Sequence, residues 1–172
     1  MFIDFKGAKT YINTGGKNID TDKTTLCFIH GSGQNHISFV QQSRYFANKG
    51  YSVIVPDLPG HGFSEGTPCS SIKENAEWIF DLFKELNLND IVYLGHSQGC
   101  LTGLELNKNH PKLLKGITFI AGSNTIPVNQ FLIDLASKDF KKAYRMMVTW
   151  GHGKDGAMFT SNMPGHAHFG EG

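Results

Sequence analysis

The chain has 172 residues, of which 40% are hydrophobic, and its 16 basic and 15 acidic side chains leave a net charge of +1. A chain of this length is predicted to form about one domain with a substantial hydrophobic core, since about 70% of its unfolded surface can be buried. The balanced charge excludes the electrostatic footprint of a nucleic-acid-binding or membrane-surface protein, and no apolar run approaches the ~20 residues of a membrane span.

The first half of the chain consists of short apolar runs separated by Gly-rich turns. Alternating apolar residues predict a hairpin, and runs that are apolar almost throughout predict strands buried on both faces. The predicted elements are, in order, a hairpin of Met1–Phe5 and Ala8–Asn13, a strand at Thr24–Ile29, a helix at Phe39–Lys49 and a strand at Ser52–Val55.

The second half continues the alternation of helices and strands. Ser71 and Glu74 fit the S-x-x-E capping box, which predicts the start of a helix. The apolar face of that helix is predicted to contain Ile72, Ala76, Ile79, Phe80, Phe83 and Leu86. There follow a strand at Asp90–Leu94, a helix at Gln98–Asn109, a strand at Gly116–Ala121 and a helical stretch at Val128–Trp150, whereas the last 22 residues show no periodicity.

This order of elements predicts an α/β fold with a mostly parallel sheet flanked by helices. We assign residues 1–127 to this core and residues 128–172 to a separate segment. The first residues mix acids and bases, unlike a secretory signal. The cysteines (Cys27, Cys69 and Cys100) are odd in number and have no CxxC spacing, which favours a reducing compartment and a cytoplasmic location.

The segment Gly95-His96-Ser97-Gln98-Gly99 is the strongest indication of catalytic chemistry in the sequence. It matches the pattern G-x-S-x-G, which also occurs in chains by chance. Whether it indicates a catalytic serine therefore depends on its place among the predicted strands and helices. Here it begins where an apolar strand ends and a helix starts. A tight turn at this point pushes the central side chain out over the sheet edge, and the glycines on either side avoid collisions with neighbouring elements. Ser97, at a helix N-terminus that stabilises negative charge, is the candidate nucleophile.

A serine that attacks a carbonyl needs hydrogen-bond donors for the oxyanion that forms. We expect one donor to be the backbone N–H of Gln98, directly after the nucleophile. The other should come from the loop after strand Thr24–Ile29, where Gly31 and Gly33 let the backbone turn its amides toward the site. The backbone N–H of Ser32 is the candidate second donor.

Four segments, in this order, resemble the α/β-hydrolase superfamily in its serine-hydrolase branch. They are HGSG after the third strand, PDLPGHGFS after the fourth, GHSQG after the fifth and HPKLLKGITFIAG leading into the sixth. The resemblance implies an α/β-hydrolase fold and hydrolysis of a small-molecule acyl substrate through an acyl-enzyme on Ser97. C–C bond hydrolysis or acyl transfer within the same superfamily are alternatives. No cofactor and no metal are expected, because no zinc or haem spacing occurs.

In that superfamily a catalytic acid and then a histidine follow the serine, after further strands. The acids after Ser97 are Glu105, Asp134, Asp139, Asp155 and Glu171, and the histidines are His110, His152, His166 and His168. None follows a run typical of a buried strand, and the helical stretch resembles the start of a cap after the sixth strand. We therefore expect a chain truncated inside the cap, lacking the last strands, with the acid and the histidine beyond Gly172. Such a chain should fold poorly and show little activity, because its last strand keeps an open apolar edge.

Other polar residues have plainer interpretations. His61 and His96 flank key turns and are predicted to serve packing or turn geometry rather than to deprotonate the serine. Asp57 is predicted to anchor the long turn that follows the strand before it. A metal site is the weaker interpretation of three later histidines, namely His152, His166 and His168.

Two rival functions come from other classes. One part of the chain is close to the dinucleotide-binding pattern G-x-G-x-x-G followed by an acidic residue. This part consists of the strand Thr24–Ile29, the G-S-G turn, the next helix and the strand that ends near Asp57. His36 replaces the third glycine and so removes the close helix–strand packing on which that pattern depends. Dinucleotide binding is the remote alternative, and a non-catalytic binding module or enzyme fragment is the other. The sequence fixes neither the acyl group nor the oligomeric state.

Overall fold

The structure, a computed structural model, describes residues 1–156, of which Val148 and residues 151–156 are described by their backbone only. Its contacts divide it into two units, one of Met1–Thr125 and one from Ile126 onward. The first unit contains β1 (Phe2–Phe5), β2 (Ala8–Asn13), β3 (Thr25–Ile29), η1 (His36–Phe39), α1 (Val40–Asn48), β4 (Ser52–Pro56), α2 (Ile72–Glu85), β5 (Ile91–His96), α3 (Gln98–Asn109) and β6 (Leu114–Ile120). The second contains α4 (Gln130–Lys138) and α5 (Phe140–Gly156).

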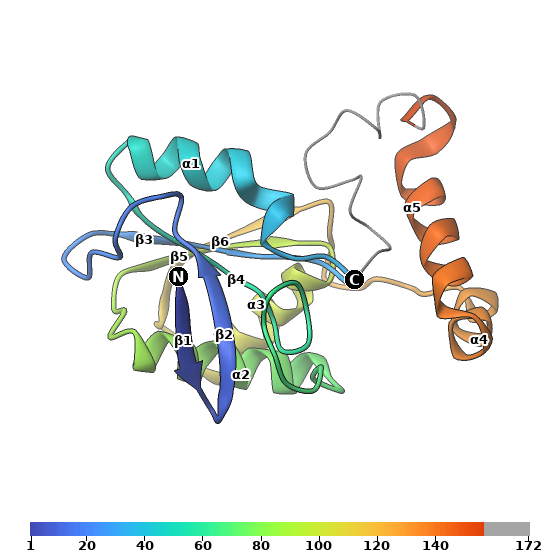
Figure 1. Ribbon diagram of the computed structural model, residues 1–172, viewed down its shortest axis with the longest axis horizontal. Helices are drawn as coiled ribbons and strands as arrows, with labels where there is room; N and C mark the ends of the chain where they lie inside the picture. The colour runs from blue at the N-terminus through green and yellow to red at the C-terminus, as the bar shows by residue number, and fades with distance from the viewer. Residues whose placement is uncertain (157–172) are drawn as a thin grey trace. The chain divides into compact units, whose positions relative to one another are not determined.

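The first unit is built on a six-stranded sheet in the order β1-β2-β4-β3-β5-β6 (Figure 1). Strands β3 to β6 run parallel, and the β1–β2 hairpin joins β4 in antiparallel orientation. This confirms the predicted mostly parallel α/β sheet with an N-terminal hairpin. Because parallel strands end at the same edge, the loops after β3, β4 and β5 meet at one place.

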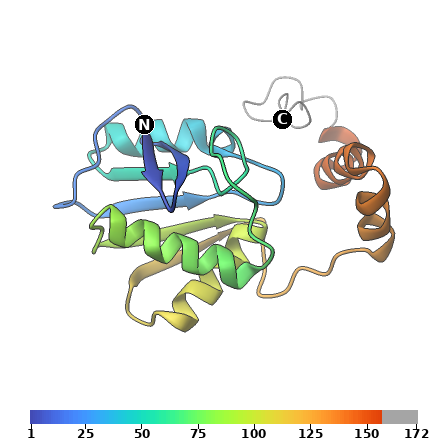
Figure 2. The same ribbon diagram turned by 60° about the horizontal axis from the view of Figure 1, so that its bottom comes forward.

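Side chains of the central strands alternate between two cores. Leu26 and Phe28 of β3 belong to the core under α1, whereas Cys27 and Ile29 belong to the core under α2. Figure 2 shows α1 on one side of the sheet and α2 and α3 on the other. Every residue of β3 and β4 is buried. The continuous apolar strands are therefore covered on both faces, as their composition predicted.

Helix α2 confirms the helix predicted after Ser71 and corrects its cap. The Ser71 hydroxyl accepts a hydrogen bond from the Glu74 N–H at 3.1 Å, as an N-cap should. The Glu74 carboxylate accepts from the Ser70 N–H at 2.7 Å instead of from Ser71. Only one of the two bonds of the predicted capping box forms.

The buried stripe of α2 is wider than its periodicity predicted. Its buried residues are Asn75, Ala76, Trp78, Ile79, Leu82 and Phe83. Trp78 is covered because the N-terminal hairpin reaches it, with the Phe5 ring in edge contact at 5.4 Å between centroids. Phe80, predicted to lie on the apolar face, packs against the core but is only partly buried, and it stacks on the His110 ring at 3.6 Å.

The helical stretch predicted at Val128–Trp150 is two helices. Asp139 interrupts it in an extended conformation (φ −148°, ψ 86°), and its carboxylate accepts from the Lys142 N–H at 3.0 Å as the cap of α5. Since this bond replaces a helical one, α4 ends at Lys138. Helix α5 then continues to Gly156, so the first of the last 22 residues are helical, and residues 157–172 lie outside the described part.

Strand β6 forms one edge of the sheet. It begins at Leu114 rather than at Gly116, and among the described residues it pairs only with β5. Phe119 is 41% exposed. A strand whose composition is typical of a sheet interior is thus only partly buried. The assignment of residues 128–172 to a cap stays a prediction.

No helix within the described residues has both the length and the apolar character needed to cross a bilayer.

The different burial of two aromatic residues on α2 gives a stability test. Trp78→Ala is expected to lower the free energy of unfolding by about 3–5 kcal/mol, as large core truncations do. Phe80→Ala should cost less than about 2 kcal/mol, because the Phe80 ring is only partly buried and so loses less buried apolar surface. Urea denaturation followed by circular dichroism measures both. A cost for Phe80→Ala equal to that of Trp78→Ala would contradict the structure and favour the stripe predicted from periodicity.

Candidate active site

Ser97 is the single residue between β5 and α3, at the sheet edge where the parallel strands end. Its backbone has φ 51° and ψ −116°, a combination that is costly for any residue with a side chain. Its N–H donates to the Ile120 carbonyl and its own carbonyl accepts from the Cys100 N–H, each at 2.9 Å. Bonds to the neighbouring strand and to the first turn of α3 thus hold this conformation.

Gly95 and Gly99 allow the helix to start this close to the sheet. A Cβ on Gly95 would lie 2.5 Å from the carbonyl carbon and oxygen of Gly99, and a Cβ on Gly99 would overlap the Ile29 carbonyl oxygen. Backbone atoms of packed elements cannot move aside separately. Glycine at both positions is therefore a steric requirement of the turn.

The loop after β3 lies directly against this turn. A Cβ on Gly31 would be 3.0 Å from the Ser97 Cβ, so the Gly31 backbone lies against the Ser97 side chain. The Ser32 hydroxyl donates to the side-chain oxygen of Gln98 at 3.1 Å. The structure thus brings together the candidate nucleophile and both residues predicted to bind the oxyanion.

The backbone N–H groups of Ser32 and Gln98 are available as donors as far as the described residues show. Gln98 is the first residue of α3, where the helix offers no acceptor for its N–H. The loop closes through a bond of 3.2 Å from the Gln34 N–H to the Gly31 carbonyl, with Gly33 at φ +66°, and this bond does not involve Ser32. Within residues 1–156 neither N–H donates to a protein acceptor. Their part in binding an oxyanion stays a prediction.

Gln34 is a residue of this loop that the sequence patterns did not single out. Its Oε1 accepts from the Gly31 N–H at 3.0 Å and contacts His96 Nδ1 at 2.8 Å. The signal that could have found it is its position, because polar side chains in loops at the carboxyl edge of a parallel sheet face the site.

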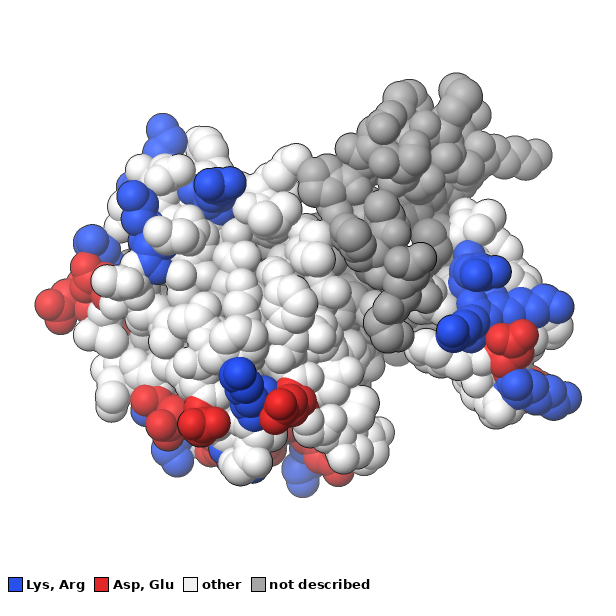
Figure 3. Space-filling view, in the orientation of Figure 1, with Lys and Arg blue, Asp and Glu red and all other residues white. Residues whose placement is uncertain are grey.

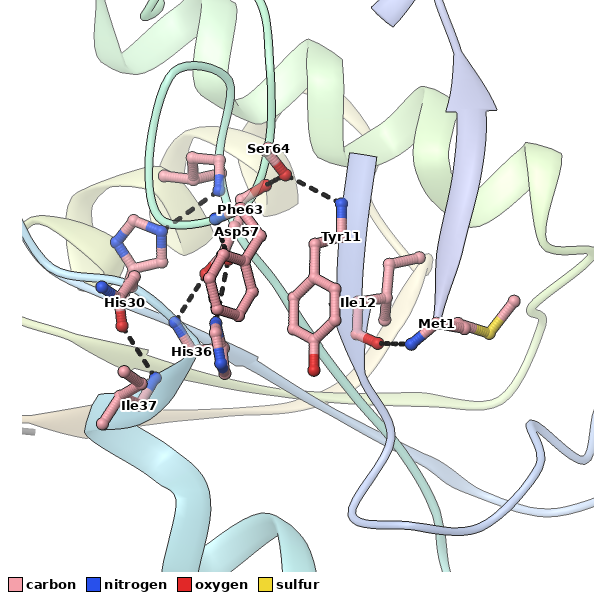
Figure 4. Close-up of polar contacts among 11 residues, drawn as sticks. Met1, Tyr11, Ile12, His30, His36, Ile37, Asp57, Phe63 and Ser64 are labelled. Atoms are coloured by element: carbon pink, nitrogen blue, oxygen red, sulfur yellow. Dashed lines mark hydrogen bonds and ion pairs between the residues drawn. The ribbon is translucent and has the colours of Figure 1, made fainter. Parts of the chain in front are cut away.

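A buried carboxylate, Asp57, joins the loop after β4 to the loop after β3 (Figure 4). It accepts from the His36 backbone N–H at 2.6 Å, from the His36 ring Nδ1 at 2.9 Å and from the Phe63 N–H at 2.9 Å. Its backbone carbonyl accepts from the Ser64 hydroxyl at 2.8 Å, and that hydroxyl oxygen accepts from the Tyr11 N–H at 2.9 Å. Asp57 therefore anchors the long turn, as predicted, and ties it to β2 and η1.

His30 directly follows β3 and is buried. Its Nδ1 lies 2.9 Å from the Gly31 carbonyl oxygen, and its Nε2 lies 3.2 Å from the Leu58 nitrogen. Because the carbonyl can only accept and the amide can only donate, the ring carries its proton on Nδ1 and is neutral. Burial lowers the pKa of His30 from 6.5 to about 4, in agreement with this bonding.

The other described histidines, and the described acids after Ser97, contact partners other than Ser97. The histidine contacts are His36 with Asp57, His61 with the Pro59 carbonyl, His96 with Gln34 and His110 with Glu77. Of the later acids, Glu105 pairs with Lys108, Asp134 accepts from Gln130 and Asp139 caps α5. The side chains of His152 and Asp155, and residues His166, His168 and Glu171, lie outside the described part. A catalytic acid and histidine beyond Gly172 stay a prediction.

Charged side chains, and side chains of the types that bind metals, are dispersed over the described part of the first unit. Figure 3 shows basic and acidic side chains both present on one face of this unit, around a broad uncharged area. In the part of the chain that the structure describes, no three His, Cys, Asp or Glu side chains gather as a metal site.

A surface hollow of about 470 Å³ lies beside the end of α2 and is lined by Phe5, Asp81, Lys84, Glu85 and Asn87. Substrate pockets are mostly apolar, whereas these walls are largely charged or polar. None of the predicted site residues lines it. We therefore treat the hollow as separate from the site at Ser97.

Comparison with known proteins gives one family. The profile described as alpha/beta hydrolase fold matches residues 24–172. The (E)-2-((N-methylformamido)methylene)succinate hydrolase of Acinetobacter baylyi is 32% identical over 98 residues, which are 56% of this chain and 37% of that protein. The crystal structure of a hydrolase from Pseudomonas aeruginosa aligns with a TM-score of 0.78 at 17% identity, covering 98% of this chain and 64% of that one. An esterase from Exiguobacterium antarcticum aligns with a TM-score of 0.68 at 19% identity, covering 86% and 59%.

The chain spans less than two fifths of the length of two curated relatives that it matches, at 39% and 37%.

The crowding at the start of α3 predicts different costs for two glycine substitutions. Gly99→Ala should destabilise the protein by about 3 kcal/mol or more, because the new methyl group meets the backbone of β3. Gly116→Ala is the matched control, since the nearest atom to a Cβ there is Val92 Cγ1 at 4.0 Å, and it should change stability by less than about 1 kcal/mol. Denaturant midpoints measure both changes, and equal stability of the two variants would show that the turn is not crowded.

The buried neutral His30 predicts a pH dependence of stability. Between its folded pKa of about 4 and its ordinary value of 6.5, the unfolded state binds more protons than the folded state. The free energy of unfolding should therefore fall as the pH is lowered through this window, by up to about 3 kcal/mol from this group.

His30→Gln is the variant that checks this. It does not titrate, and its amide can both donate and accept, so its unfolding free energy should fall less steeply between pH 6.5 and 4 in urea denaturation. The same slope in variant and wild type would assign the pH dependence to other groups.

Proposed function

Because the chain belongs to the α/β-hydrolase fold family, we propose that it carries the nucleophile of a serine hydrolase that cleaves an ester-like acyl bond through an acyl-enzyme. The observation that supports this most is Ser97, held alone at φ 51° between β5 and α3 with the loop after β3 in contact with it. Strained residues at the end of a parallel strand are typical of catalytic positions.

In the first step, the Ser97 oxygen attacks the carbonyl carbon of the substrate while its proton passes to a general base. A C–O bond forms, and the electron pair of the carbonyl double bond moves to oxygen, which accepts hydrogen bonds from the N–H groups of Ser32 and Gln98. The tetrahedral intermediate then collapses, the bond to the leaving group breaks, and the leaving group takes the proton from the base.

In the second step, water attacks the acyl-enzyme by the same route. The base takes a proton from the water and returns it to the departing Ser97 oxygen, which releases the carboxylic acid. We propose that this base is a histidine that follows Ser97 along the chain, in the order typical of this family.

Two observations support hydrolysis over the remote dinucleotide alternative. Asp57 stands where that pattern places the acid that binds a ribose, but its carboxylate is fully buried and already accepts from His36 and Phe63. The relative from Acinetobacter baylyi, 32% identical over this part of the chain, carries the name of a hydrolase. The proposed substrate is a small acyl compound, since the chain shows no strong charge imbalance that would favour a polyanion.

A fluorophosphonate probe tests the proposal, because it reacts covalently with serines that have an activated hydroxyl and an oxyanion site. The native-length protein should be labelled on the peptide that contains Ser97, and Ser97→Ala should abolish the labelling. Turnover of p-nitrophenyl acetate should fall in parallel by on the order of 10³-fold or more.

Ser123→Ala is the matched control, because Ser123 is an exposed serine after β6 and should not affect labelling. Undiminished turnover in Ser97→Ala, or labelling that maps to another serine, would contradict the proposed function.

A further inference from the structure

One side-chain oxygen, that of Gln34, contacts both segments of the candidate site, namely the loop after β3 and the turn at Ser97. Gln34 Oε1 lies 3.0 Å from the Gly31 nitrogen and 2.8 Å from Nδ1 of His96, a residue 62 positions away in the chain. Gly31 belongs to the loop after β3, and His96 directly precedes Ser97. The two segments are therefore bonded to the same atom.

The bonding partners fix the roles of both groups. The Gly31 N–H can only donate, so the amide of Gln34 must present its oxygen at this place. A carbonyl oxygen can only accept, so His96 must carry a proton on Nδ1. The bond also occupies the Gly31 N–H, whereas the next amide along the loop, that of Ser32, has no acceptor among the described residues.

The space around this bond is tight. A Cβ added to Gly31 would lie 3.0 Å from Ser97 Cβ, 3.2 Å from Gln34 Oε1 and 3.2 Å from His96 Nδ1. The loop itself has glycine on both sides of Ser32, and glycine gives the backbone more freedom than any other residue. The contacts of Gln34 Oε1 with Gly31 and His96 therefore add a direct connection between this loop and the turn at Ser97.

We infer, building on the function proposed above, that Gln34 is a positioning residue for the oxyanion site. It holds the loop after β3 against the turn at Ser97, so that the Ser32 N–H stays at a constant distance from the Gln98 N–H. It also keeps His96 in the form protonated on Nδ1. Gln34 does not touch the reacting atoms and acts through the Gly31 and His96 N–H groups.

Three variants separate this role from general stability. Gln34→Met keeps the length of the side chain and removes the acceptor. Gln34→Glu keeps an oxygen that can accept both bonds but adds a charge. Gln42→Met makes the same chemical change on the exposed side of α1 and is the matched control.

The first measurement is the rate of fluorophosphonate labelling of Ser97 together with kcat and KM for p-nitrophenyl acetate, in the native-length protein. Gln34→Met should lower the labelling rate and kcat by about 10- to 100-fold, less than the ~10²–10³-fold for complete loss of an oxyanion donor, with KM little changed. Gln34→Glu should recover part of this loss, and Gln42→Met should match the wild type.

The second measurement is the ring ¹⁵N spectrum of His96, which a merely structural role of Gln34 would not predict. The wild type and Gln34→Glu should show the proton on Nδ1, and Gln34→Met should show a smaller share of this form. Labelling of Gln34→Met at the wild-type rate, or Gln34→Glu no faster than Gln34→Met, would overturn the positioning role while leaving Ser97 as nucleophile. Absence of Ser97 labelling in the wild type would instead overturn the proposed function, and the positioning role with it.

Discussion

The site depends on how closely α3 approaches the strands beside it. The Ile29 carbonyl oxygen occupies the place of a Cβ on Gly99, and the ring of Tyr93 occupies that of a Cβ on Gly103 one turn later. The Tyr93 hydroxyl, fully buried, donates to the Gly99 carbonyl at 2.8 Å, which fixes the helix along its axis. With α3 held in this way, Ser97 has no relaxed conformation that still connects β5 to the helix. Its cost of about 1–3 kcal/mol is offset by packing that forms only at this short distance.

Helix α3 is held by close packing, whereas the loops around Ser97 are held mainly by buried hydrogen bonds. Asp57 and His36 join the loop after β4 to the loop after β3, and the neutral ring of His30 accepts from the Leu58 N–H across the same gap. Asp57, His36 and His30 each have hydrogen-bond partners, which compensate the penalty of removing these groups from water. The two loops are interlocked through backbone N–H groups, which leaves few conformations open to either of them.

The sequence predicted the features whose causes are local. Helix α3 begins at Gln98 and ends at Asn109 as predicted, because the G-x-S-x-G turn and a nearby proline define its ends, and the Ser71 cap formed for the same reason. Features that need distant partners were missed. The burial of Trp78 depends on a hairpin more than seventy positions earlier, and the bond between Gln34 and His96 spans 62 positions. Hydrophobic periodicity describes one helix or strand at a time, so it does not show which distant residues will cover or hydrogen-bond that element.

The combination of steric and polar constraints bears directly on chemistry at Ser97. An oxyanion exists only briefly during a reaction, and donors that must first reorient stabilise it less than donors already in place. The N–H of Gln98 is held in place by the packing of α3. The N–H of Ser32 lies between two glycines, so its orientation depends on side-chain bonds from the loop to the turn, such as those of Gln34 and of the Ser32 hydroxyl. Steric and polar constraints act on the same few atoms around Ser97. In the reaction proposed above, both oxyanion donors would therefore be oriented before a substrate carbonyl binds beside Ser97.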